Sequence, residues 1–140
     1  MPALSGYAVS PMINLPSRDR PAVLVVDDES FSRLSTAEML HSAGFEALEA
    51  CSGAEAVLAL EGSTKIRVLV TDIDLRAGIN GIVLAACVDR PWPTVGIIMT
   101  SGKVRPLPGD VPSRAHFLPK PYCEAKMLAA IRGIIEHRVT

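Results

Sequence analysis

The chain alternates short aliphatic runs with helix-forming segments, and each aliphatic run stops at a polar residue. The clearest runs are AVLVV (22–26), IRVLVT (66–71) and VGIIMT (95–100), and shorter ones lie at 45–50 and 116–118. Continuous apolar runs are typical of parallel strands that helices cover on both faces. Hydrophobic residues make up 49% of the chain and aromatic residues only 4%, so the apolar side chains are mostly aliphatic, which suits such a sheet.

Capping residues indicate where the first two helices lie. One helix is predicted between Ser30, which can cap its start, and Gly44, which suits the position after its end. Its apolar residues recur every three positions: Phe31, Leu34, Ala37 and Leu40. A second helix is predicted after Ser52, because Ser52 followed by Glu55 forms a capping box. Each helix follows a predicted strand, as a βα unit requires.

The rest of the chain continues this alternation with one exception. Helices are predicted after Gly81, up to Pro91, and along 127–135. The segment 102–115 stands where a helix is due, but its three prolines and two glycines predict a loop with at most one turn of helix. Repeated βα units with right-handed crossovers predict a doubly wound, five-stranded parallel α/β sheet. We expect the flavodoxin-like order 2-1-3-4-5 and a degenerate fourth helix.

Charge, length and cysteine content exclude several classes of protein. The 14 basic and 15 acidic side chains give a net charge of −1 without a basic block, so neither nucleic acid nor a membrane is an expected partner. The cysteines, Cys51, Cys87 and Cys123, lack the spacing of a zinc site or disulfide framework, which predicts a reducing, cytoplasmic setting. The 140 residues predict a flexible N-terminal arm over 1–20 and one domain over 21–140.

Polar residues follow four of the predicted strands and should meet at one edge of the sheet. They are Asp27 and Asp28, Asp72, Ser101 and Lys120. Three crowded carboxylates favour a divalent cation, and an all-oxygen site with open positions favours Mg²⁺. The lysine can pair first with a carboxylate and later with a phosphoryl oxygen, to which the serine hydroxyl can also donate. The set predicts attack by an aspartate on a phosphoryl group, giving an acyl phosphate.

Four segments contain these polar residues: VLVVDDE, LVTDIDL with Gly81, IIMTSG and FLPKPY. In their order and spacing over residues 21–140, they resemble the response-regulator receiver domains of bacterial two-component signalling. The resemblance implies a stand-alone receiver in which Asp72 accepts phosphate from a phosphohistidine of a histidine kinase or histidine phosphotransfer protein. It implies no enzymatic activity beyond self-catalysed phosphoryl transfer and slow autodephosphorylation.

The resemblance also implies a metal site at the acidic cluster. Asp28 and Asp72 would bind Mg²⁺ together with the main-chain carbonyl of Asp74, and Asp27 would assist through water. The side chain of Asp74 lies two positions after the acceptor, where family members vary, and we expect it to affect the lifetime of the phosphoryl group.

Three further positions receive roles from the resemblance. Lys120 would be the family lysine, joined to Pro121 by a cis peptide bond, and Phe117 the aromatic residue whose rotamer reports phosphorylation. The switch hydroxyl would be Ser101. Thr100 stands directly before it, so the register of the strand decides which hydroxyl faces the phosphoryl group, and Ser101 is the favoured choice.

Two other functions are compatible with parts of this pattern. In a haloacid-dehalogenase-like phosphatase, Asp72 would be the nucleophile and Asp74 the general acid/base, but the acidic pair at 27–28 comes too early and the chain is short for a cap domain. A phosphate-independent receiver-like adaptor is the other alternative. The segment 102–115 replaces the helix that receivers use to dimerise or to meet targets, so a homodimer is possible and the downstream protein target is left open.

Overall fold

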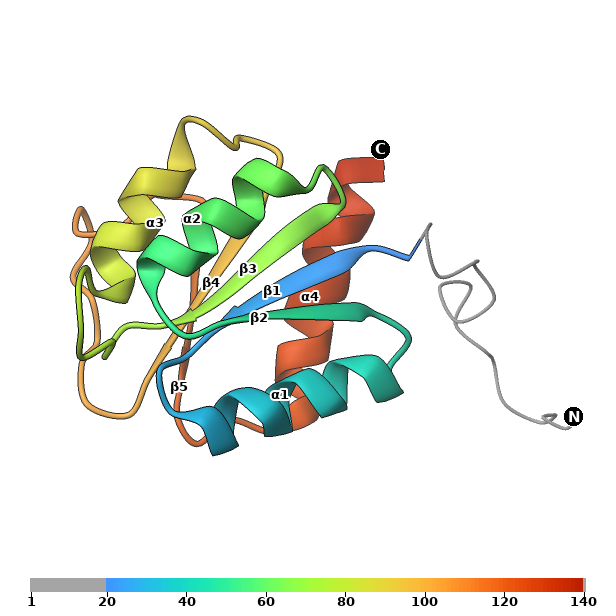
Figure 1. Ribbon diagram of the computed structural model, residues 1–140, viewed down its shortest axis with the longest axis horizontal. Helices are drawn as coiled ribbons and strands as arrows, with labels where there is room; N and C mark the ends of the chain where they lie inside the picture. Colours follow the sequence, from blue (N-terminus) through green and yellow to red (C-terminus); the bar gives the residue numbers. More distant parts are fainter. Residues whose placement is uncertain (1–19, 140) are drawn as a thin grey trace, which may run out of the picture.

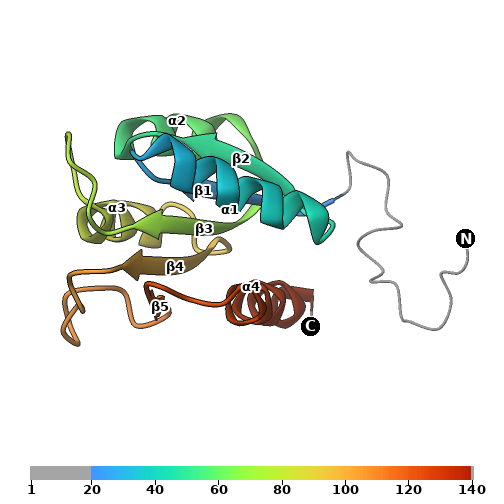
Figure 2. The same cartoon turned by 90° about the horizontal axis from the view of Figure 1, so that it is seen from below.

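The computed structural model describes residues 20–139, without the side chains of 138 and 139. The predicted N-terminal arm therefore lies outside the described part of the chain, except for Arg20. One parallel sheet has the order β2-β1-β3-β4-β5, as predicted (Figures 1 and 2). The elements are β1 (Ala22–Val26), α1 (Ser30–Ser42), β2 (Glu46–Ala50), α2 (Gly53–Gly62), β3 (Ile66–Asp72), α3 (Gly81–Asp89), β4 (Gly96–Ser101), β5 (His116–Pro119) and α4 (Glu124–Val139).

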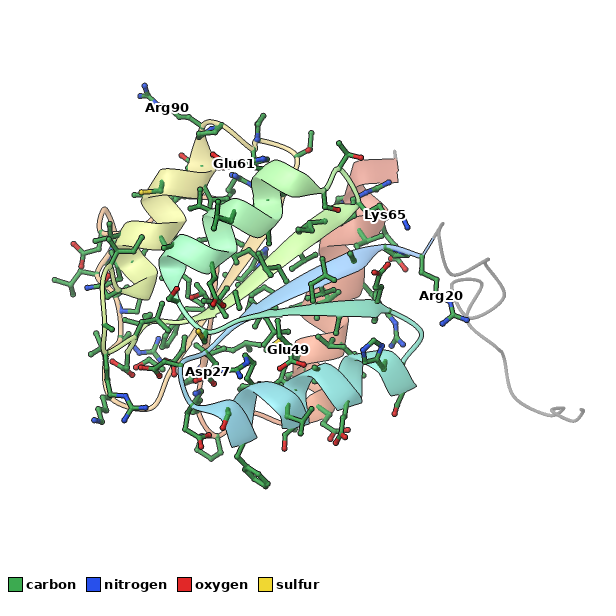
Figure 3. All side chains as sticks on the ribbon, in the orientation of Figure 1. Arg20, Asp27, Glu49, Glu61, Lys65 and Arg90 are labelled. Atoms are coloured by element: carbon green, nitrogen blue, oxygen red, sulfur yellow. The ribbon has the colours of Figure 1, made fainter. Side chains whose placement is uncertain are left out.

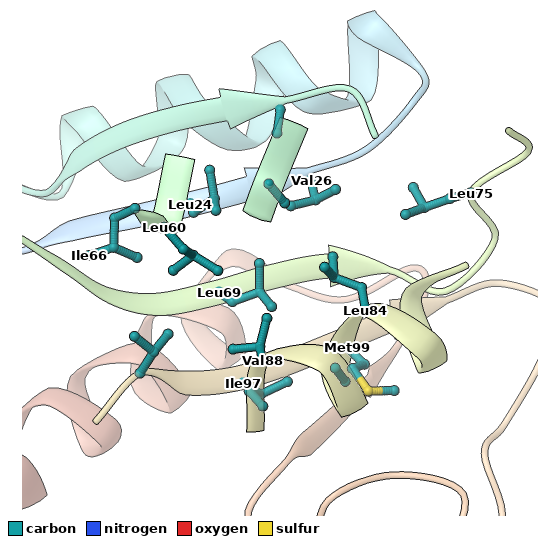
Figure 4. Close-up of a cluster of buried hydrophobic side chains, with 14 of the residues drawn as sticks. Leu24, Val26, Leu60, Ile66, Leu69, Leu75, Leu84, Val88, Ile97 and Met99 are labelled. Carbon is teal, nitrogen blue, oxygen red and sulfur yellow. The ribbon is translucent and has the colours of Figure 1, made fainter. Parts of the chain in front are cut away.

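Helices cover both faces of the sheet, so the protein has two apolar cores. Successive side chains of a strand point to opposite faces. Leu24 and Val26 of β1 therefore pack with residues of α2 and α3 (Figure 4), whereas Val23 and Val25 pack with residues of α1 and α4. Among the described helices, none is long and apolar enough to cross a lipid bilayer.

Two of the three predicted helix-end residues are confirmed, and one is wrong. Gly44 follows α1 with a positive φ of 98°, and the Ser52 hydroxyl caps α2 by accepting from the amide of Glu55 at 3.2 Å. The cap of α1 is Glu29 rather than Ser30, because the Glu29 carboxylate accepts from the amide of Ser32 at 2.6 Å. The longer acidic side chain thus caps the helix from one residue earlier, and Ser30 begins the first turn.

The apolar residues of α1 do not share one buried face. Leu40 and Ala37 are buried, but the side chain of Leu34 is 49% exposed and that of Phe31 is 76% exposed. A helix turns by about 100° per residue, so nine residues separate Phe31 from Leu40 by about half a turn. Phe31 therefore lies on the surface at the start of α1, close to the carboxyl edge of the sheet.

Residues 102–115 form no helix, as predicted, and an arginine fixes this loop to the rest of the domain. Arg114 pairs with the carboxylate of Asp89 at 2.8 Å and donates to three main-chain carbonyls around the end of α3 and the start of β4. Val111 and Ala115 pack against the core that α2 and α3 cover. The loop thus covers the part of the sheet that a fourth crossover helix would cover.

Candidate functional site

Four strands deliver polar residues to one edge of the sheet, as the sequence predicted. Val26, Thr71 and Thr100 lie near the carboxyl ends of three adjacent strands, because Val26 pairs with Thr71 and the next residue, Asp72, pairs with Thr100. Asp27 follows β1 at this edge, beside the start of α1 (Figure 3). The parallel register therefore brings residues that are far apart in the sequence to one place.

An open pocket of about 530 Å³ occupies this edge. It contains the predicted aspartates and the predicted lysine, together with residues that the sequence analysis did not select. Its lining residues are Asp27, Asp28, Glu29, Ser32, Asp72, Asp74, Arg76, Gly102, Lys103 and Lys120. Carboxylates outnumber basic groups in this lining, so the pocket is negatively charged.

Lys120 connects two of the predicted acids. Its ammonium nitrogen lies 3.1 Å from Oδ2 of Asp72 and 3.9 Å from Oδ2 of Asp27. Partial burial lowers the pKa of Lys120, but the charge and hydrogen bond of Asp72, helped by Asp27, outweigh this effect and raise the pKa above its usual value. The lysine is therefore fully protonated at neutral pH and held against the predicted phosphoacceptor.

The carboxylate of Asp72 is held from both sides. Its Oδ2 accepts from Lys120, and its Oδ1 accepts from the amide of Asp74 at 3.0 Å. Each carboxylate oxygen has a second lone pair, so both remain able to attack an electrophile or bind a cation. The side chain is 12% exposed and lines the pocket.

Gly81 packs directly against the main chain of Asp72. It begins α3, and its amide donates to the carbonyl of Ile73 at 3.0 Å. A Cβ at this position would lie 2.3 Å from the carbonyl oxygen of Asp72 and 2.7 Å from Cα of Ile73. Only glycine allows α3 to start so close to the main chain of Asp72.

Asp28 has a partner that the sequence analysis missed. Its Oδ2 accepts from the main-chain amide of Arg76 at 2.8 Å and from Nε of the same residue at 3.0 Å. Burial raises the pKa of Asp28, but the two hydrogen bonds and the charge of Arg76 outweigh it and lower that pKa below its usual value. Nothing in the sequence distinguished Arg76 from other loop arginines, because its partner is 48 residues away.

The register of β4 separates Thr100 and Ser101 onto opposite faces of the sheet. Ser101 donates to Oδ2 of Asp74 at 2.8 Å, and its oxygen accepts from the amides of Lys103 and Val104. Thr100 is 3% exposed, and its carbonyl accepts from the amide of Ile73. Of the two hydroxyls, that of Ser101 therefore contacts a pocket residue, and this contact with the Asp74 side chain was not predicted.

Phe117 is not among the residues that line the pocket. It pairs with Met99 of β4 and packs, partly buried, against the core that α2 and α3 cover. The guanidinium of Arg105 lies 5.2 Å from the centre of its ring. The peptide bond between Lys120 and Pro121 is cis, as the resemblance implied.

The oxygen donors of the pocket fit a magnesium ion in kind, although their present positions do not form a closed set of ligands. Within residues 20–139, no three histidine, cysteine or acidic side chains stand close enough together to hold a metal as they are placed. Asp28 is turned to Arg76, and Asp72 and Asp27 face Lys120. Two basic side chains, Arg76 and Lys120, thus already pair with the three carboxylates that were predicted to bind Mg²⁺.

The fold and the site together define a receiver domain of response regulators. Residues 23–132 match the response regulator receiver domain family, so the chain belongs to this family. Receiver domains are signalling phosphoacceptors that generally bind Mg²⁺ at their acidic pocket and interact with histidine kinases or phosphotransfer proteins. This membership favours the receiver prediction over the phosphatase alternative.

Individual relatives agree with this assignment. The sensor kinase CckA of Brucella abortus (strain 2308) is 28% identical over 120 residues, which cover 81% of this chain and 12% of that kinase. The chain therefore spans only a small part of this relative. A receiver protein from Sinorhizobium medicae has a TM-score of 0.80 at 25% identity, covering 86% of this chain and 98% of that one. The receiver domain of the hybrid histidine kinase CckA has a TM-score of 0.68 at 28% identity, covering 81% and 97%.

Proposed function

We propose that Asp72 is the phosphoacceptor and takes its phosphoryl group from a phosphohistidine of a histidine kinase or histidine phosphotransfer protein. The ion pair between Lys120 and Asp72 in the acidic pocket is the observation that carries this proposal. A carboxylate oxygen of Asp72 attacks phosphorus and forms a P–O bond. The P–N bond to the donor imidazole breaks, and its electron pair returns to the nitrogen.

The lysine and the serine have separate roles in this proposal. Lys120 neutralises Asp72 before transfer and can pair with a phosphoryl oxygen afterwards, because its ammonium group is a mobile point charge. The Ser101 hydroxyl, which donates to Asp74, donates to a phosphoryl oxygen instead after transfer. Asp28, Asp72 and the main-chain carbonyl of Asp74 would hold Mg²⁺, with Asp27 assisting through water, and the bound ion would supply positive charge that offsets the phosphoryl group.

The output of the proposed switch is a changed surface. The Ser101 hydroxyl accepts from the amides of Lys103 and Val104, so a new partner for this serine alters the start of the loop 102–115. Arg105 of this loop covers the Phe117 ring, which connects the predicted aromatic switch to the same surface. We propose that a protein target, or a second copy of the chain, meets this loop in the cytoplasm, and neither nucleic acid nor a membrane is a proposed partner.

Incubation with acetyl phosphate and Mg²⁺, followed by intact mass measurement, tests the proposal. We expect one phosphoryl adduct per chain in the wild type and none in Asp72→Asn. Many turnovers of a phosphate ester would instead indicate a phosphatase. The absence of an adduct with acetyl phosphate and with a protein phosphodonor would favour a phosphate-independent adaptor.

A further inference from the structure

The contact between Arg76 and Asp28 in the pocket has no part in the function predicted from the sequence. Its guanidinium Nε lies 3.0 Å from Oδ2 of Asp28, and its own main-chain amide donates to the same oxygen at 2.8 Å. The Arg76 side chain is 76% exposed, whereas that of Asp28 is 19% exposed. The arginine therefore reaches from the surface onto a carboxylate that the pocket partly encloses.

The position of this guanidinium matters because Asp28 is one of the proposed cation ligands. Magnesium binds carboxylate oxygens at about 2.0–2.1 Å, so a bound ion would lie within a few ångströms of a group that is already positively charged. Two like charges at that separation repel each other measurably even where water screens them. Each of the two cations therefore weakens the binding of the other to Asp28.

The charge balance of the pocket points the same way. Five carboxylates and three basic side chains line it, which leaves a net charge of −2; these residues are Asp27, Asp28, Glu29, Asp72, Asp74, Arg76, Lys103 and Lys120. Removal of the Arg76 charge would make the pocket more negative. The change would occur at Asp28, one of the carboxylates that would bind the cation. The main-chain amide would still hold Asp28 in place.

We infer that the Arg76 guanidinium is an intramolecular competitor of the divalent cation at Asp28. It neutralises this carboxylate while the cation is away, and its charge opposes the binding of the cation there. The affinity of the pocket for Mg²⁺ is therefore set partly by a side chain of the loop that follows β3. This inference rests on the cation site of the proposed function.

Calorimetric titration of the unphosphorylated protein with Mg²⁺ tests this inference without any readout of phosphorylation. We expect Arg76→Ala and Arg76→Gln, which both remove the charge, to tighten Mg²⁺ binding about three- to tenfold. Arg90→Ala removes the same charge at the end of α3, away from the pocket lining, and should bind Mg²⁺ like the wild type. Circular dichroism confirms that each variant is folded.

The outcomes separate the inference from the function on which it rests. Unchanged binding in both Arg76 variants would overturn the competition. Weaker binding in Arg76→Ala but not in Arg76→Gln would overturn it too, because the arginine would then orient Asp28 for the metal. If neither the wild type nor the Arg76 variants bind Mg²⁺, the competition is also refuted. Loss of Mg²⁺ binding in Asp28→Asn identifies the site, and the phosphoryl adduct on Asp72 is measured independently.

Discussion

Replacement of Gly81 by alanine should destabilise the domain and displace the phosphoacceptor together. The added Cβ would lie 2.3 Å from the carbonyl oxygen of Asp72, whereas real Cβ contacts essentially never fall below 3.0 Å. The main chain at Asp72 or the start of α3 must therefore move by at least about 0.7 Å. Overpacking of this kind costs about 1–3 kcal/mol of unfolding free energy. In a domain of this size, that loss lowers the melting temperature by about 4–12 °C.

The same shift should slow phosphoryl transfer, because a displacement on the order of 1 Å in a reacting group costs up to about 100-fold in rate. Thermal melting by circular dichroism and the time course of the intact-mass adduct measure the two effects. Gly133→Ala is the matched control: apart from the adjacent residues and the backbone of its own helix, no atom lies within 4 Å of its added Cβ, and α4 should gain about 0.5–1 kcal/mol. A Gly81→Ala variant with the melting temperature and adduct rate of the wild type would refute the reasoning.

Four other substitutions test separate parts of the site. Asp74→Asn should lengthen the phosphoryl lifetime about two- to tenfold, because Ser101 loses a charged competitor for its hydroxyl proton; equal lifetimes would remove the idea. Lys120→Ala should keep the adduct in intact-mass measurements but lose the response in a reporter assay. Phe31→Ala should slow phosphoryl transfer from a protein donor but not from acetyl phosphate, because this exposed ring lies at the start of α1, next to the pocket. Asp28→Asn should flatten the loss of stability in acid, measured by unfolding at a series of pH values.

The sign of the last effect follows from the pKa of Asp28. Burial raises this pKa, but Arg76 lowers it by more, so the unfolded chain binds this proton more readily than the folded one. The stabilisation is therefore fully present above about pH 4, near the usual pKa of 3.8, and is lost as the pH falls through the lower folded value. If the unfolding free energies of the wild type and of Asp28→Asn fell equally as the pH is lowered, this assignment would be contradicted.

The sheet and the main site residues could be predicted because they depend on short-range patterns. An aliphatic run that stops at a polar residue predicts both a strand and its end, and parallel pairing then brings Asp72, Ser101 and Lys120 together without further information. The proline-rich segment 102–115 likewise prevented a helix through local geometry alone. The observed cap of α1, Glu29, lies one residue before the predicted cap, Ser30. The side chains of both residues can accept hydrogen bonds from main-chain amides in the first turn of a helix, so the sequence did not distinguish them.

The contacts made by loop side chains could not be predicted in this way. Arg76 pairs with Asp28, and Asp74 with Ser101, only because the loop after β3 folds back over the pocket. Such pairs depend on tertiary structure rather than on spacing. The role of Phe117 as a reporter of phosphorylation and the choice of Ser101 over Thr100 stay predictions until phosphorylation is measured.

Hydrogen bonds hold the loop 102–115 at both of its ends. At one end, the amides of Lys103 and Val104 bind the Ser101 hydroxyl, and at the other, Arg114 is bonded to Asp89 and three carbonyls. The bonds of Arg114 oppose a rearrangement that begins at the serine, since movement of this arginine would break several of them at once. The exposed residues between the two ends, such as Leu107, can therefore change without breaking either attachment, and a different set of these residues would present a different binding surface beside the same phosphorylation chemistry.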